Sequence, residues 1–87
     1  MKFWAKIFLD NHMLKDTVVE IDTEDTRTHK VFAAIEEIMY EFDLPKPIWL
    51  DSNVNDFKTH SKVKFYRDSF VEDISFDYLE FMVLEED

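Results

Sequence analysis

The strongest constraint on the fold is one amphipathic stretch, THKVFAAIEEIMYEF, at residues 28–42. Its apolar residues recur at helical spacing and share one side: Val31, Ala34, Ile35, Ile38, Met39 and Phe42, with Phe32 at the edge. The opposite side carries Lys30, Glu36, Glu37, Tyr40 and Glu41. Because so wide an apolar stripe needs a second layer to cover it, the pattern predicts a helix packed on a β-sheet.

The segments around this helix alternate between apolar and polar residues, as strands do. Residues 2–9 and 17–22 predict a hairpin with a loop longer than two residues, and Pro45 and Pro47 predict the end of the helix. We then expect strands at 48–50, 63–66 and 78–84, and a short helical segment at about 53–60 capped by Asp51 or Ser52. The prediction is one α+β domain over residues 1–87: a mixed β-sheet with one long amphipathic helix on one face, in the order ββαβββ, plus the short helical segment.

This element order, and some residues, resemble the ubiquitin-like β-grasp family. The similar positions are the first strand at Met1 to Lys6, the helix-capping pair Asp25-Thr26, the inward helix residues Val31 and Ile35, and the last strand at Tyr78 to Leu84. The resemblance implies that the first and last strands are parallel neighbours at the sheet centre. The chain ends in Glu-Glu-Asp rather than the Gly-Gly through which that family's carriers act, so no conjugation role is expected. In composition the chain is similar to short acidic bacterial proteins that have no assigned role.

Composition excludes several classes of function. Glycine is absent, so phosphate-binding loops and dinucleotide fingerprints are excluded in their standard form, and left-handed turn positions must fall to residues such as Asp10-Asn11 or those from Asp51 to Asn55. Cysteine is also absent, which removes thiolate metal sites and thiol catalysis. A formal net charge of -10 opposes direct contact with nucleic acid or anionic membranes. We expect no cofactor and no metal, and a cytoplasmic location.

A basic segment at residues 58–67 interrupts this acidity. It holds Lys58, His60, Lys62, Lys64 and Arg67, and no acidic residue. Asp56 and His60 are four residues apart, a spacing that suits a hydrogen bond or a metal pair. The basic side chains either pair with the acidic residues of the last strand or form a contact for an anion or a partner.

The far side of the predicted sheet has too much apolar surface for a small monomer. The residues expected to point away from the helix are Trp4, Phe8, Val18, Tyr66, Tyr78, Met82 and Leu84. Either Val54, Phe57, Phe70 and Phe76 cover this face, or it binds a partner. The partner hypothesis centres on Trp4, Phe8, Tyr66, Tyr78 and Met82, because aromatic residues and Met are enriched at interfaces.

The sequence shows no nucleophile or base with a partner group, so an enzyme is not expected. The leading interpretation is a non-enzymatic protein-interaction module that binds another protein, or forms a weak homodimer, around Trp4 and Phe8. The alternative is an acidic inhibitor or nucleic-acid mimic that occupies a basic groove. Binding led by charge should weaken at high salt, whereas binding through the aromatic face should persist.

Overall fold

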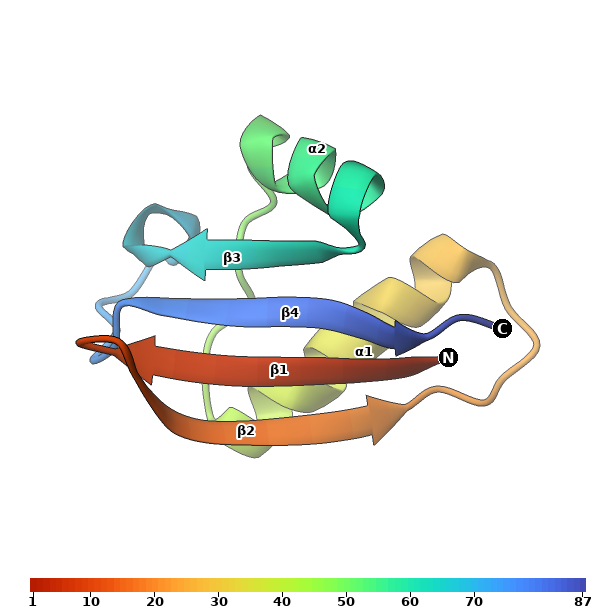
Figure 1. Cartoon of the computed structure of the whole chain (residues 1–87), viewed down its shortest axis with the longest axis horizontal. Coiled ribbons are helices and arrows are strands. Elements are labelled where there is room, and N and C mark those ends of the chain that lie inside the picture. The colour runs from red at the N-terminus through yellow and green to blue at the C-terminus, as the bar shows by residue number, and fades with distance from the viewer.

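The computed structural model describes all 87 residues as two helices and a four-stranded sheet (Figure 1). The strands are β1 (Lys2–Leu9), β2 (His12–Glu20), β3 (Lys62–Tyr66) and β4 (Tyr78–Glu85), and the helices are α1 (Arg27–Phe42) and α2 (Asp51–His60). A short 3-10 turn, η1 (Arg67–Ser69), follows β3. The strand order is β2-β1-β4-β3, and every neighbouring pair is antiparallel. The α+β class is therefore confirmed.

The sheet differs from the β-grasp expectation in two ways. The first and last strands, β1 and β4, are central neighbours as expected, but they run antiparallel, so the predicted parallel pair and mixed sheet are wrong. The predicted strand at residues 48–50 is also absent. The Ile48 N–H donates to the Ser69 carbonyl at 2.6 Å, and Trp49 packs against the hydrophobic core. This segment connects the helices and adds no strand between α1 and α2.

The first hairpin turns over two residues, Asp10 and Asn11, with φ angles of 50° and 66°. These left-handed positions fall to Asp and Asn as predicted, but the expected longer loop is wrong. Pairing shifts between Ile7 and Phe8, because Ile7 lies opposite Lys15 and Phe8 lies opposite Met13. Leu14 is thus the extra residue of a β-bulge, which interrupts the alternation of β2 and hides its first half from a period-two pattern.

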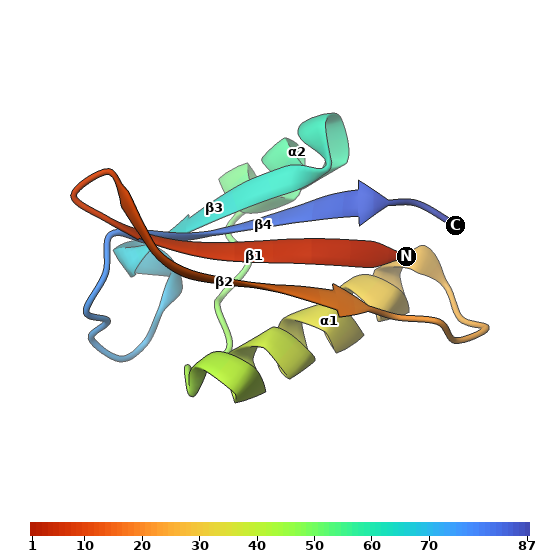
Figure 2. The same ribbon diagram turned by 60° about the horizontal axis from the view of Figure 1, so that its bottom comes forward.

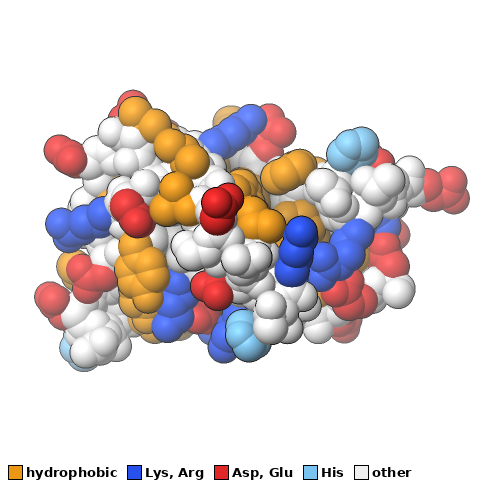
Figure 3. Space-filling model, turned by 90° about the horizontal axis from the view of Figure 1, so that it is seen from above, with side chains coloured by type: hydrophobic (Ala, Val, Ile, Leu, Met, Phe, Trp, Pro, Cys, Tyr) orange, Lys and Arg blue, Asp and Glu red, His pale blue; other side chains and the backbone are white.

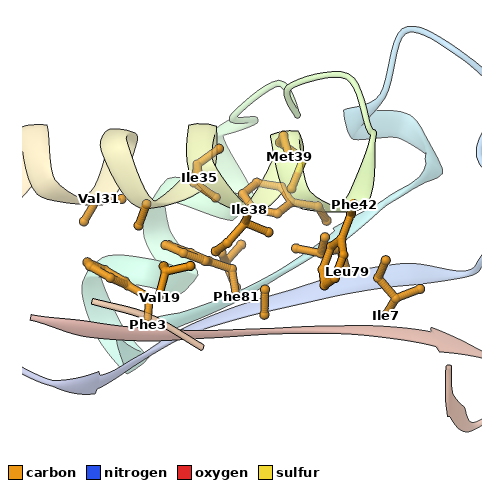
Figure 4. Close-up of a cluster of buried hydrophobic side chains, with 14 of the residues drawn as sticks. Phe3, Ile7, Val19, Val31, Ile35, Ile38, Met39, Phe42, Leu79 and Phe81 are labelled. Atoms are coloured by element: carbon orange, nitrogen blue, oxygen red, sulfur yellow. The ribbon is translucent and has the colours of Figure 1, made fainter. Parts of the chain in front are cut away.

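Helix α1 matches the predicted stretch and lies across one face of the sheet (Figure 2). It begins after Thr26, whose side-chain oxygen accepts the His29 N–H at 3.2 Å, and it ends at Asp43, which has a left-handed φ of 55°. Its apolar stripe meets the inward residues of β1 and β4, including Phe3, Leu79 and Phe81 (Figure 4). Lys30, expected on the solvent side, is instead buried.

Helix α2 forms where a short helical segment was predicted, and it lies along the edge strand β3 (Figure 1). Asp51 is its first residue rather than its cap, and the Asn53 side chain accepts the Leu50 N–H at 2.9 Å. The predicted left-handed positions from Asp51 to Asn55 are therefore helical, and Ser61 takes the left-handed conformation at the helix end. Phe57 stacks on Phe81 with ring centroids 5.7 Å apart, so α2 joins the core beside α1.

The irregular connection before β4 also joins this core. Phe70 and Phe76 are buried in the same cluster as the inward strand residues, with ring centroids 6.0 Å apart. Phe57, Phe70 and Phe76 therefore do not cover the outer face of the sheet. Neither helix combines the length and apolar character that a membrane crossing requires.

Candidate protein-interaction surface

The sheet face opposite α1 carries no covering element and faces the viewer in Figure 1. We call it the open face. Because side chains of paired residues point to the same side of a sheet, its residues form rows across the order β2-β1-β4-β3. The first row is Glu20, Lys2 and Glu85; the second is Val18, Trp4, Met82 and Lys62; the third is Asp16, Lys6, Glu80 and Lys64; the fourth is Met13, Phe8, Tyr78 and Tyr66.

The structure places all five sequence-predicted partner residues on the open face. Trp4 and Met82 are directly paired in the second row, while Phe8, Tyr78 and Tyr66 follow one another in the fourth. Tyr66 retains 50% of its accessible surface, and the other four are partly exposed. The open face is therefore apolar surface in contact with solvent and not a second core.

The aromatic side chains of the fourth row contact one another, and Trp4 of the second row is held by a hydrogen bond. The rings of Phe8 and Tyr78 stack with centroids 5.1 Å apart, and the rings of Tyr66 and Tyr78 lie 5.4 Å apart. The Trp4 indole N–H donates to the Asp16 carboxylate at 2.8 Å. Side chains fixed in this way lose little conformational entropy on binding, which favours their use as contact residues.

A charged row separates the two apolar rows. The Lys6 ammonium lies 3.0 Å from the Glu80 carboxylate, and both side chains are largely shielded from solvent. Lys6 also lies 3.9 Å from the centre of the Trp4 ring, and Lys64 lies 5.0 Å from that of Tyr78. The Trp4 ring thus helps to shield Lys6, which strengthens its interaction with Glu80, whereas Lys64 is exposed to solvent.

The basic segment does not converge on one site. His60, Lys62 and Lys64 line a hollow of about 200 Å³ together with Asp56. Lys58 lines a different groove, and Arg67 lies 3.8 Å from Asp77 beyond the end of β3. Lys64 lies opposite Glu80 in the strand register but forms no ion pair with it, so Arg67 with Asp77 is the ion pair that joins this segment to the acidic residues 72–87. Metal-binding groups of three His, Cys, Asp or Glu side chains do not occur.

A second groove, which the sequence did not predict, lies between α1 and α2. It has a volume of about 240 Å³, and its lining is Arg27, Thr28, Val31, Phe32, Trp49, Val54, Phe57 and Lys58. Figure 3 shows hydrophobic side chains in a hollow on this side of the molecule, with Lys and Arg side chains at its border. Arg27 is already bound to Glu86 at 2.9 Å. No local pattern could reveal the groove, because it depends on how two separate helices pack.

Two carboxyl groups near the start of α1 have perturbed pKa values, and neither belongs to the open face. The His29 side chain and the Thr26 N–H hydrogen-bond Asp25 and hold its pKa below 3.8. The Lys30 ammonium and the amino terminus likewise lower the pKa of Asp87. Both groups anchor the ends of elements, so they indicate structural roles rather than acid-base chemistry.

Comparison with family models, curated proteins and solved structures found no match for this chain. The functional inference therefore depends on the geometry described above.

Proposed function

We propose that this chain is a non-enzymatic protein-interaction module that binds a partner protein through the open face. The observation that supports this proposal is the placement of Trp4, Phe8, Tyr66, Tyr78 and Met82 together on a sheet face that no segment of the chain covers. Contiguous exposed apolar surface of this kind is typical of interaction sites.

The composition of the open face also supports binding to protein. Aromatic residues and Met are the types enriched at interface centres, and the charged row between the apolar rows would fix the orientation of a partner. The complementary partner surface is apolar with charges of alternating sign. An extended nucleic acid or an anionic membrane fits this pattern poorly, because each presents a single sign of charge.

The proposal is tested by comparing partner capture by the wild type, Trp4→Ser and Tyr40→Ser. Trp4 lies at the centre of the open face, whereas Tyr40 is 89% exposed on the outer side of α1 and serves as the matched control. We expect Trp4→Ser to lose the proteins that the wild type and Tyr40→Ser retain. Capture that is unchanged in a folded Trp4→Ser protein would contradict the proposed surface.

A second candidate function, an acidic inhibitor or nucleic-acid mimic, is supported by the outer side of α1. Glu36, Glu37 and Glu41 are all exposed there, and Lys46 lies 3.8 Å from only one of them, Glu36. Such a surface would bind a basic groove through charge. Raising the salt concentration separates the two functions, because screening weakens exposed charge contacts much more than apolar contacts. A Glu37→Lys variant that loses its partner, beside a Trp4→Ser variant that retains it, would favour this second function.

A further inference from the structure

The charged row of the open face alternates in sign across all four strands. In the order β2-β1-β4-β3 it is Asp16, Lys6, Glu80 and Lys64, which reads negative, positive, negative, positive. When the row is read in reverse order, each position carries the charge opposite to that of the original row. A surface that complements itself under reversal can pair with an identical copy about a two-fold axis.

We propose that the partner seated on the open face is a second copy of this chain, and this inference rests on the proposed function. The two-fold axis runs parallel to the strands, between β1 and β4. It places β1 of one copy over β4 of the other, and β2 over β3. Lys6 then faces Glu80 of the second copy, and Asp16 faces its Lys64, so all four charges of the row meet opposite charges.

The same axis also matches most positions of the other rows. In these rows Trp4 faces Met82, Phe8 faces Tyr78, Met13 faces Tyr66, and Lys2 faces Glu85 of the second copy. One position is less favourable, because Val18 faces Lys62 and can contact only its aliphatic stem. Two sheets packed with nearly aligned strands form a common arrangement, so the proposed geometry needs no distortion of the fold.

The charged row also disfavours the other face-to-face arrangement. A two-fold axis running across the strands would place each strand over its own copy. When this axis passes through the charged row, Lys6 faces Lys6 and Glu80 faces Glu80 of the second copy, and both of these side chains are largely shielded from solvent. Like charges in such a setting are strongly unfavourable, so the row selects the axis parallel to the strands.

The size of the open face predicts a weak dimer. The four strands have 8, 9, 5 and 8 residues. At about 3.3 Å per residue and about 4.8 Å between strands, they give a face of roughly 500 Å² per copy. The pair would bury roughly 1,000 Å², near the lower limit for specific interfaces. Each copy carries a net charge of -10, and this long-range repulsion is screened by salt more than the close contacts of the row. The dimer should therefore tighten as salt rises from low to physiological concentration.

The test exchanges the charges of the outer pair, which acts only between copies in the proposed dimer. Asp16→Lys and Lys64→Glu each convert two attractive contacts into two repulsive ones, and we expect each single variant to dimerise at least about tenfold more weakly than the wild type. An equimolar mixture of the two variants restores opposite charges at both contacts, as does the double variant with itself. Sedimentation equilibrium at roughly 0.1 to 1 mM, where weak dimers become populated, measures each association.

The double variant separates contacts between copies from contacts within one copy. Within one copy, the double variant still has a Lys at position 16 beside Lys6 and a Glu at position 64 beside Glu80, as the single variants do. Recovery of dimerisation in the double variant can therefore come only from contacts with the second copy. Asp16→Lys also removes the acceptor of the Trp4 indole N–H, and this loss is common to the single and double variants. Lys58→Glu and Glu37→Lys are the matched charge controls outside the open face, and both should dimerise like the wild type. Circular dichroism confirms that each variant is folded.

A wild type that remains monomeric at these concentrations and at physiological salt would overturn the homodimer. So would a wild-type dimer that the single variants leave unchanged, or a double variant no stronger than the single variants. None of these results contradicts binding of a different protein, which the capture experiment with Trp4→Ser decides separately. Loss of the dimer in the single variants with recovery in the mixture supports the proposed axis.

Discussion

Phe81 gives the sharpest test of the core that supports the open face. It is fully buried on β4, its ring stacks on Phe3 with centroids 5.2 Å apart, and it stacks on Phe57 of α2 at 5.7 Å. Truncating a buried Phe to Ala costs about 3–5 kcal/mol, and each aromatic pair adds about 0.5–1.5 kcal/mol beyond the buried area. Measured truncation costs already include such contacts, and this residue joins two aromatic pairs. We therefore expect Phe81→Ala to lower the free energy of unfolding by an amount at the upper end of the truncation range, about 4–5 kcal/mol.

A loss of that size is a large share of the total stability. A chain of 87 residues has roughly 4–13 kcal/mol at the usual stability per residue. Urea denaturation followed by far-UV circular dichroism measures the change, with Tyr40→Ala as an exposed control that should shift the free energy of unfolding by less than about 0.5 kcal/mol. A loss below about 1.5 kcal/mol for Phe81→Ala would refute a tightly packed stack that joins α2 to the sheet.

Three further predictions concern the rest of the fold. Ile35→Asp should fail to fold, because it places an unpaired carboxylate in the core. The exposed control Tyr40→Asp should fold normally. A soluble Ile35→Asp protein that unfolds cooperatively would contradict the placement of α1. The Lys30 ammonium lowers the pKa of Asp87, so the carboxylate stabilises the fold above pH 3.8, and this contribution disappears as the pH falls through the lowered pKa. Asp87→Asn should therefore be less stable than the wild type at neutral pH and equally stable in strong acid. Equal denaturation midpoints of the two proteins at neutral pH would count against the contact. Asn11→Gly should raise the free energy of unfolding by about 0.5 kcal/mol, since glycine is the preferred second residue of a hairpin turn with positive φ, and a decrease measured by thermal denaturation would argue against this turn.

The sequence by itself determined the elements with strong periodicity. The helix was predicted at residues 28–42 and runs from Arg27 to Phe42, and the first and last strands lie within a residue of their predicted limits. The same alternation assigned Trp4, Phe8, Tyr66, Tyr78 and Met82 to one face of the sheet. These predictions succeeded because repeated burial on one side imposes a period that a short window of sequence records.

Other features depended on contacts between distant segments. Alternation is the same in parallel and antiparallel strands, so it could not reveal that β4 runs antiparallel to β1. A single bulge at Leu14 removed the alternating pattern from the start of β2. Trp49 was predicted to lie in a strand, but it packs between the two helices and β3, and these contacts join segments that are distant in the sequence.

The open face was decided only by the tertiary structure. Phe57, Phe70 and Phe76 lie in segments whose sequence does not specify which side of the sheet they cover. All three are buried in the core on the α1 side of the sheet, where Phe57 contacts Phe81 and the rings of Phe70 and Phe76 contact each other. Burial of these large apolar side chains favours this placement. The aromatic residues of the open face were therefore left in contact with solvent. The charges between them alternate in sign across the sheet because β1 and β4 pair at its centre and place Lys6 beside Glu80.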